Sequence, residues 1–236
     1  MFVPAPPPVI ATIPSPPKGA QWAKKPRITD RLNHESDGSG YIPTGFSHLF
    51  VMPSNGGAVR QVTQGDFHHR GNIDWSKDGQ YLFFSANRNE DWEYDFRNSE
   101  LYRVHLKTGE IKALTEKDGP DRDPTISPDG TLIAYLGYED KREAYQNTLL
   151  YIMDIDGQNK RTVSGSLDMS ISDIHWGKNS DKIYFSYDHH GNGKIGQINL
   201  KGNFSKIADN RGGTSLGRPY GSGSFSVSNN GKIAYN

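Results

Sequence analysis

The fold is decided by the stretch Ile126-Ser127-Pro128-Asp129-Gly130-Thr131-Leu132-Ile133-Ala134-Tyr135. An apolar residue comes first, a polar turn follows, and a mainly apolar run closes the stretch. Asp and Gly are favoured in tight turns because they tolerate the backbone angles that such turns require. The stretch therefore predicts a strand, a tight turn and a second strand.

The same pattern occurs four times along the chain. The copies lie at 75–84, 126–135, 176–185 and 227–235, so their first residues are 51, 50 and 51 positions apart. A second strand–turn–strand pattern lies at 49–63, 101–115, 150–163 and 195–208. Four short strands in about 50 residues are typical of one blade of a β-propeller.

We therefore expect an all-β protein, a β-propeller of about four blades, each a four-stranded antiparallel sheet. The predicted blades cover 22–64, 72–115, 123–164 and 172–209, with a half blade at 224–236. The first two strands of the first blade would be degenerate and lie within 27–44. Residues 1–21 are rich in proline and predict an extended arm without a core of its own. An antiparallel sandwich is the alternative fold, and a near-constant period argues against it.

The composition excludes several classes of protein. Lys and Arg number 27, as do Asp and Glu, so there is no basic excess of the kind that binds nucleic acid or a membrane surface. The chain has no cysteine, which excludes disulfides, thiol nucleophiles and Cys-ligated zinc. It has no apolar run of the roughly 20 residues that a membrane helix needs. The N-terminus also lacks the basic start of a signal peptide, so we expect a cytoplasmic protein. We also expect that the chain binds no cofactor.

Three longer stretches resemble a known family. They are Asn-Arg-Asn-Glu-Asp-Trp-Glu-Tyr-Asp at 87–95, Ile-Ala-Tyr-Leu-Gly-Tyr-Glu-Asp-Lys-Arg at 133–142, and Gly-Gly-Thr-Ser-Leu-Gly-Arg-Pro-Tyr-Gly at 212–221. Together with the TolB-like Ser-Pro-Asp-Gly repeat, they resemble the propeller of bacterial prolyl oligopeptidase-family serine peptidases, of the acylaminoacyl-peptidase and dipeptidyl-peptidase-like branch. The resemblance covers about 22–236.

The resemblance implies a function for the chain. In such peptidases a propeller of seven or eight blades is followed by an α/β-hydrolase domain that holds the Ser-Asp-His triad. With about four blades and no such domain before Asn236, this chain is expected to be a non-catalytic propeller portion that gates and contacts peptide substrate. The alternative is a free-standing TolB-like propeller that binds a protein or peptide.

Two features invite a chemical role and are rejected. Ser215 lies in Gly-Thr-Ser-Leu-Gly at 213–217, which fits the nucleophile motif G-x-S-x-G. That motif needs a helix after the serine, and Pro219 with the glycines around it prevents one. The pairs His68-His69 and His189-His190 are poor metal ligands, because neighbours on a strand point to opposite faces. We expect both pairs to be solvated turn residues, and no metal site.

Loop lengths indicate which face of the propeller is functional. In an antiparallel blade, the loops between the second and third strands and the links between blades share one face. These segments are long here (86–100, 137–148, 187–194, 64–71 and 210–223), whereas the turns of the other face are short. Insertions gathered on one face usually mark the working face.

The candidate substrate contacts on that face are Glu93, Asp95, Arg97, Arg218 and Tyr220. The resemblance implies that propeller carboxylates hold the substrate amino terminus, for which Glu93 and Asp95 are the candidates. A solvated charged loop, or a loop that docks on the hydrolase domain, is the competing interpretation.

The open form of a partial propeller has a further consequence. Uncovered blade edges would favour self-association with another copy. Alternatively, the final strand pair could join the pair at 49–63 and close a four-blade ring. The predicted partners are therefore the hydrolase domain, a peptide substrate and, through the blade edges, a second copy.

Overall fold

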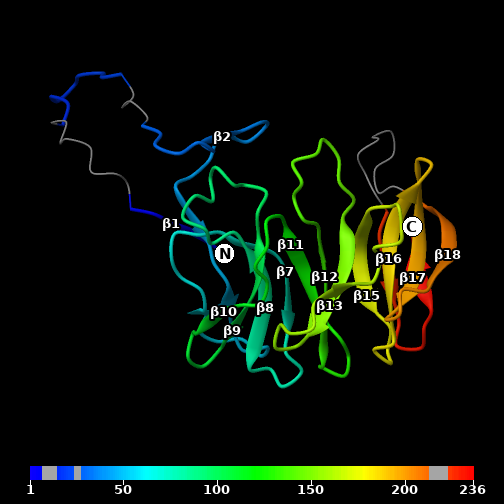
Figure 1. Cartoon of the computed structure of the whole chain (residues 1–236). Helices are drawn as coiled ribbons and strands as arrows, with labels where there is room; N and C mark the ends of the chain where they lie inside the picture. Colours follow the sequence, from blue (N-terminus) through cyan, green and yellow to red (C-terminus); the bar gives the residue numbers. More distant parts are fainter. Residues whose placement is uncertain (7–14, 24–27, 213–222) are drawn as a thin grey trace.

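The structure is a computed structural model that describes residues 1–6, 15–23, 28–212 and 223–236. Three four-stranded antiparallel sheets form its centre. The first sheet contains β7 (His69–Trp75), β8 (Tyr81–Ala86), β9 (Glu100–His105) and β10 (Ile111–Ala113); the second contains β11 (Asp121–Ile126), β12 (Leu132–Gly137), β13 (Leu149–Asp154) and β14 (Arg161–Thr162); the third contains β15 (Ile171–Trp176), β16 (Lys182–His189), β17 (Asn192–Asn199) and β18 (Phe204–Arg211). The sheets stand side by side as successive blades (Figure 1), which confirms the predicted all-β propeller.

Polar side chains build the tight turn that the sequence predicts. The Ser127 hydroxyl donates to the Asp129 carboxylate (2.6 Å) and accepts a hydrogen bond from the Leu132 backbone N–H (2.9 Å). Ser76 and Asp78 repeat the arrangement one blade earlier, with an oxygen–oxygen distance of 2.5 Å. The Ser-x-Asp-Gly motif therefore folds the backbone by local hydrogen bonds.

A second motif closes the outer strand pair of three blades. In each, a hydroxyl at the end of the fourth strand accepts a hydrogen bond from a backbone N–H of the third strand. The pairs are Thr63 with Leu49 (3.0 Å), Thr115 with Leu101 (2.9 Å) and Ser164 with Leu150 (2.8 Å). Because these bonds are buried, they satisfy backbone donors that would otherwise be costly.

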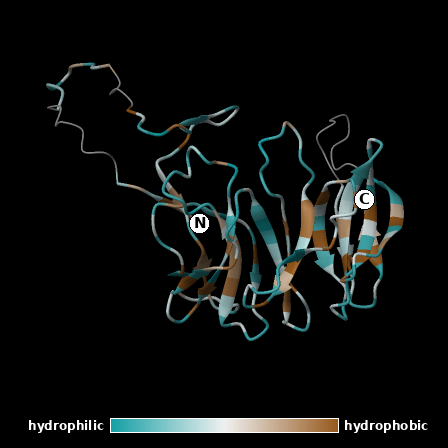
Figure 2. Cartoon of the chain, in the orientation of Figure 1, coloured by the Kyte–Doolittle hydropathy of each residue, from teal (hydrophilic) through white to brown (hydrophobic). Residues whose placement is uncertain are grey.

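The hydrophobic core lies between blades. Four clusters join successive sheets, and their largest buried side chains include Phe84, Phe83, Leu136, Phe185 and Ile195. Figure 2 shows hydrophobic bands along the central strands and hydrophilic loops above and below them. Each blade is therefore held by its neighbours rather than by a core of its own.

The first blade is assembled differently from the others. Its outer pair is β5 (Phe50–Val51) with β6 (Arg60–Gln61), and β4 (Gly45–Ser47) directly precedes β5. β1 (Phe2–Pro4) pairs antiparallel with β4, on the edge that faces away from β6. The backbones of Met1 and His48 exchange two hydrogen bonds of 2.8 Å. The N-terminal strand therefore takes the place that the second strand has in the complete blades.

This arrangement differs from the expected arm and first blade. Residues 2–4 were expected to be part of an unpacked arm, but the Phe2 ring and the Val3 backbone lie against Gly45, where any side chain would collide with them. The described part of 27–44 forms only a short hairpin, β2 (Glu35–Ser36) with β3 (Gly40–Tyr41), which pairs with no blade strand. The hairpin lacks the alternating apolar residues needed for a place in the sheet.

The last described strands form a two-stranded half blade. β19 (Phe225–Val227) and β20 (Ile233–Tyr235) pair with each other and pack through Phe225 on Tyr184 and Ile195 of the third sheet. None of the clusters formed by described residues joins this hairpin to the first blade, and the two lie at opposite ends of the molecule in Figure 1. Of the two arrangements considered, the structure is the open arc.

The long loops share one face. The segments between β8 and β9 and between β12 and β13 rise from the top edge in Figure 1, and the short turns lie at the bottom. None of the residues that the structure describes form a helix long and apolar enough to cross a membrane.

Candidate functional site

Two long loops from neighbouring blades meet on this face. The loop 87–99 follows β8 and the loop 138–148 follows β12. They line a pocket of about 230 Å³ that contains Tyr94, Asp95, Phe96, Arg97, Asp140 and Arg142. Residues nearly fifty positions apart in the sequence therefore face one small space.

A larger pocket of about 550 Å³ adjoins it. Asp95 and Arg142 line both pockets. The larger one continues between the second and third blades to Glu100, Thr115 and Lys117. Carboxylates and cations therefore converge on one concave region, which is the usual form of a ligand site.

Local hydrogen bonds hold Asp95 in place. Its backbone carbonyl accepts a hydrogen bond from Asn87 Nδ2 (2.7 Å), and its Oδ2 accepts one from Asn98 Nδ2 (3.0 Å). Its backbone N–H donates to the Asp91 carbonyl (3.0 Å), which closes a turn. The loop is thus ordered by its own polar side chains, and Asp95 is presented to the pocket in a fixed position.

The other predicted contact residues differ in their placement. Glu93 is partly buried, and its Oε1 has no hydrogen-bond partner among the described residues. Arg97 is exposed and lies over the Phe96 ring, 5.6 Å from its centroid. Arg218 and Tyr220, and Ser215 with them, lie outside the described residues. The structure therefore brings Asp95 and Arg97 together with Arg142, while Glu93 does not line either pocket.

The floor of the larger pocket is a buried carboxylate that the sequence analysis missed. Glu100 Oε1 accepts a hydrogen bond from the Lys117 backbone N–H (2.8 Å), and Oε2 accepts one from the Thr115 hydroxyl. Burial raises the pKa of Glu100, although both hydrogen bonds oppose the shift. The only signal in the sequence is an acidic residue directly before the apolar pair Leu101-Tyr102.

A second buried carboxylate, that of Asp121, lies close enough to Glu100 to interact with it. Lys117 Nζ is 2.6 Å from Asp121 Oδ1 and 4.3 Å from the centroid of the Tyr151 ring. Burial raises the pKa of Asp121, and the ammonium group of Lys117 opposes the shift. Gly137 opposes Asp121 on β12, and a side chain there would occupy the space of the carboxylate. One lysine is thus placed near two carboxylates.

His68 and His69 are packed between the first two blades, so the expectation of solvated turn residues is wrong for this pair. His68 Nδ1 accepts a hydrogen bond from the Ser47 backbone N–H (3.2 Å), and His69 Nδ1 is 3.3 Å from the Ser47 carbonyl. His69 Nε2 faces Arg88 at 2.7 Å. Burial is the largest cause that lowers the pKa of both histidines to about 4. The reason is tertiary: β4 folds against the link that holds them.

The rings of His68 and His69 have different aromatic neighbours. The His68 ring lies beside Phe46 and Trp92, and the His69 ring beside His48 and Phe84. His189 and His190 are exposed. Within the described ranges, no group of three or more His, Cys, Asp or Glu side chains is placed to hold a metal ion.

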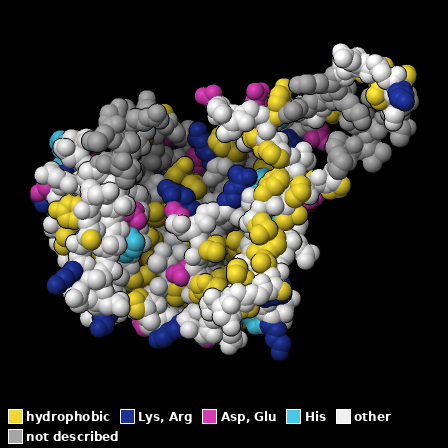
Figure 3. Space-filling view, turned by 180° about the vertical axis from the view of Figure 1, so that it is seen from behind, with side chains coloured by type: hydrophobic (Ala, Val, Ile, Leu, Met, Phe, Trp, Pro, Cys, Tyr) yellow, Lys and Arg dark blue, Asp and Glu magenta, His cyan; other side chains and the backbone are white. Residues whose placement is uncertain are grey.

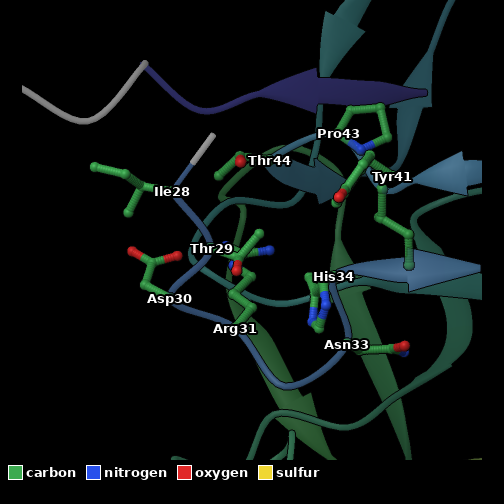
Figure 4. Close-up of a pocket in the computed structure, with 10 residues that line it drawn as sticks. Ile28, Thr29, Asp30, Arg31, Asn33, His34, Tyr41, Pro43 and Thr44 are labelled. Atoms are coloured by element: carbon green, nitrogen blue, oxygen red, sulfur yellow. The ribbon is translucent and has the colours of Figure 1, made fainter. Parts of the chain in front are cut away.

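Two further concave regions lie elsewhere on the molecule. Figure 3 shows the side opposite to that of Figure 1, which is hollowed and carries charged side chains of both signs among hydrophobic ones. A pocket of about 340 Å³ lies at the N-terminal hairpin, between residues 28–34 and 41–44 (Figure 4). There Arg31 lies over the Phe46 ring at 4.6 Å. This pocket is lined by one segment only, without any residue of the complete blades.

The fold and the site together define a class of protein: an open β-propeller arc whose interblade loops form a charged pocket on one face. The family model of the dipeptidyl peptidase IV N-terminal region matches residues 20–144, which is more than half of the chain. The chain therefore belongs to the dipeptidyl peptidase IV N-terminal region family.

A curated relative agrees with this assignment. Dipeptidyl-peptidase 5 of Porphyromonas gingivalis is 29% identical over 131 residues, which cover 54% of this chain and 19% of the relative. The chain thus aligns with only about a fifth of that protein's length.

Solved structures agree on the fold alone, because their identities are low. TolB from Acinetobacter baumannii has a TM-score of 0.57 at 20% identity, covering 79% of this chain and 42% of that one. An oligogalacturonate lyase gives 0.61 at 17%, covering 81% and 53%. Puromycin hydrolase gives 0.53 at 16%, covering 73% and 30%. The propeller architecture is therefore shared by proteins of different function.

Proposed function

We propose that this chain is the non-catalytic propeller portion of a prolyl oligopeptidase-family serine peptidase, and that it contacts and gates peptide substrate for an α/β-hydrolase domain. One observation carries the proposal: the loops of two blades place Asp95 and Arg142 on a shared pocket whose floor is Glu100. Family membership supports the peptidase context.

The pocket suits a peptide end. A free amino terminus carries an ammonium group, which pairs well with a carboxylate held in a partly enclosed site. Asp95 Oδ2 is oriented by Asn98, and Oδ1 accepts no hydrogen bond among the described residues. Glu100 adds negative charge below it. We infer that Asp95 receives the substrate amino terminus, and that Glu93 supports it through the charge of the loop.

Arg142 supplies the opposite charge. Its backbone has a φ of 57°, a conformation that costs energy for a residue with a side chain. The Asp140 carboxylate stabilises the turn by accepting a hydrogen bond from the Arg142 N–H (2.7 Å). A guanidinium held at this position can donate to a peptide carbonyl or carboxylate. Arg97, which stacks on Phe96 at the rim, extends the same positive edge.

The proposal is tested by peptide binding to the purified chain, measured by calorimetry. We expect a tetra-alanine amide with a free amino terminus to bind, its N-acetylated form to bind at least tenfold more weakly, and Asp95→Asn to remove this difference. Asp181→Asn, an exposed carboxylate in a turn of the other face, is the matched control and should bind as the unchanged chain does. Equal binding of both peptides would overturn the assignment of Asp95.

A second assay tests the division of labour. The chain should not hydrolyse chromogenic aminoacyl or acyl-aminoacyl substrates, since the chemistry is assigned to a hydrolase domain. Hydrolysis that is lost in Ser215→Ala would show instead that the chain is an enzyme. If the chain binds folded protein partners but neither peptide, the TolB-like binding module becomes the better account.

A further inference from the structure

A further pocket lies on the long-loop face, beside the candidate site. It has a volume of about 440 Å³ and lies between the loop 138–148 and the link that joins β14 to β15. Glu139, Lys141 and Glu143 line this pocket. Asp140 and Arg142, which alternate with them along the loop, line the smaller pocket of the candidate site. One loop therefore forms a wall of two pockets.

The further pocket repeats the position of the larger candidate pocket, one blade later in the chain. The buried hydroxyl bond at the end of the fourth strand aligns the two blades, since it occurs in both. The pairs of corresponding lining residues are Asn98 and Asn147, Glu100 and Leu149, and Tyr102 and Tyr151. The asparagine and the tyrosine are therefore present in both pockets, whereas the carboxylate of one floor is replaced by a leucine in the other.

Tyrosine rings make up much of the lining. The three are Tyr138, Tyr145 and Tyr151. Lys117 Nζ lies 4.3 Å from the centroid of the half-buried Tyr151 ring, and Arg88 lies over the corresponding Tyr102 ring at 5.7 Å. A cation thus contacts the tyrosine at this position in both blades, as the electron-rich face of an aromatic ring favours.

Hydrogen bonds between the loop and the link fix the mouth of the pocket. Tyr145 is 72% exposed, yet its hydroxyl lies 3.2 Å from that of Ser170. Ser170 Oγ donates to Asn147 Oδ1 (3.2 Å), and Asn147 Nδ2 donates to Asp168 Oδ1 (3.0 Å). An aromatic ring that is exposed and also held in place loses little freedom when it contacts a ligand.

The charge around the pocket is negative. Three carboxylates line it, those of Glu139, Glu143 and Asp168. Lys141 is the one cation among the described residues of the lining, and none of the three carboxylates forms an ion pair within the described part of the chain. Burial and then the carboxylates of Asp121 and Glu139 raise the pKa of Tyr151, so negative charge acts on the pocket wall. These groups favour a cationic ligand.

We propose that this pocket binds an arginine side chain of a peptide. A guanidinium group is planar, stacks on aromatic rings and donates two parallel hydrogen bonds to a carboxylate. Its methylene groups would lie along Leu149 and the tyrosine rings, and its charged end would pair with Glu139 and Glu143 at the mouth. The peptide as ligand rests on the proposed function, but Asp95 is not part of this pocket.

Blocked peptides test the proposal, because they have no free amino terminus for Asp95. By calorimetry with the purified chain, we expect acetyl-Ala-Arg-Ala-amide to bind at least tenfold more tightly than the same peptide with citrulline, which keeps the shape without the charge. Glu139→Gln/Glu143→Gln should reduce the ratio below threefold. Glu110→Gln, an exposed carboxylate in a turn of the other face, is the matched control and should keep it. Equal binding of both peptides by the unchanged chain would refute the proposal.

Further variants separate this pocket from the candidate site. Tyr145→Ala removes the exposed ring and should weaken binding of the arginine peptide roughly threefold, while Tyr145→Phe keeps the ring and should bind nearly as the unchanged chain does. Asp95→Asn should leave the preference for arginine over citrulline unchanged. If Asp95→Asn removes that preference and Glu139→Gln/Glu143→Gln does not, the arginine lies in the candidate site and this proposal is wrong. Failure of the tetra-alanine amide to bind would contradict the assignment of Asp95 alone.

Discussion

Lys117 Nζ and Asp121 Oδ1 lie 2.6 Å apart at the junction of the second and third blades, with the Asp121 side chain only 1% exposed. Asp121 begins β11, the innermost strand of the third blade, at a position that holds Ile171 in the next blade. A charge here is compensated by one lysine, and Glu100 of the candidate pocket is close enough to interact with both. The charge on the pocket floor, Glu100, therefore interacts with the charges of Lys117 and Asp121 at the blade junction.

Removing the lysine should destabilise the chain. Lys117→Met leaves the Asp121 carboxylate buried without its cation, and we expect a loss of about 2 kcal/mol, because Lys117 is partly exposed and fully buried pairs cost roughly 3–5 kcal/mol to break. Urea unfolding at pH 7 measures it. Lys112→Met, an exposed lysine on β10, is the control. Equal stability of the two variants would mean that the ion pair is not needed at this junction.

The glycine opposite Asp121 should be equally sensitive. A methyl group at 137 would overlap the Asp121 carboxylate and the Pro120 carbonyl, so Gly137→Ala has to displace the start of β11. We expect a loss of roughly 1–3 kcal/mol, as for other overpacked sites. Thermal unfolding measures the change, and Gly165→Ala, at an exposed position without a positive φ whose nearest neighbour is the Thr162 methyl group at 3.0 Å, should lose less. A Gly137→Ala chain of unchanged stability contradicts this packing.

The Thr115 hydroxyl makes two buried hydrogen bonds, one from the Leu101 backbone N–H and one to Glu100. Thr115→Val removes both while keeping the shape, so a loss of about 2 kcal/mol is expected. Ser164→Ala removes only the corresponding bond from Leu150 and should cost about 1 kcal/mol. Chemical denaturation of both variants compares them, and a smaller loss for Thr115→Val would argue against its bond to Glu100.

The histidines at the first junction make stability depend on pH. In the folded chain the pKa of His68 and of His69 is about 4, below the ordinary value of 6.5, because burial disfavours the charged ring. The unfolded chain therefore binds more protons between these values. Their contribution to stability is fully present above pH 6.5 and is lost as the pH falls towards 4.

A variant isolates this contribution, since the raised pKa of Glu100 and of Asp121 acts in the opposite direction. We expect the melting temperature of the unchanged chain, relative to His68→Asn/His69→Gln, to fall by several degrees between pH 7 and pH 5. His34→Gln, an exposed histidine, should follow the unchanged chain. The assignment fails if the difference between the double variant and the unchanged chain is the same at both pH values.

Much of the fold could be predicted from local sequence. The Ser-x-Asp-Gly turn and the alternating strand after it depend on residues within ten positions, and their recurrence every 50 residues predicts the successive four-stranded antiparallel sheets that the structure contains. Loop length also predicted which face carries the long loops. Asp95 and Arg97 are candidate contacts because their loop is long and charged.

The rest required contacts between distant residues. β1 could not be predicted, because Phe2–Pro4 forms a strand only where Gly45 leaves room for it. Arg142 joins Asp95 only when two blades stand side by side. A histidine pair beside glycines looked like a solvated turn, and its burial is imposed by β4.

The sequence by itself determined the blade, its period and the face that carries the long loops, because hydrogen bonds within a turn and side-chain alternation along a strand are local properties. Only the tertiary structure decided that the arc is open and that a lysine near two carboxylates lies beneath the candidate pocket. These depend on which surfaces meet after folding, and burial then sets the energies of the charges enclosed there.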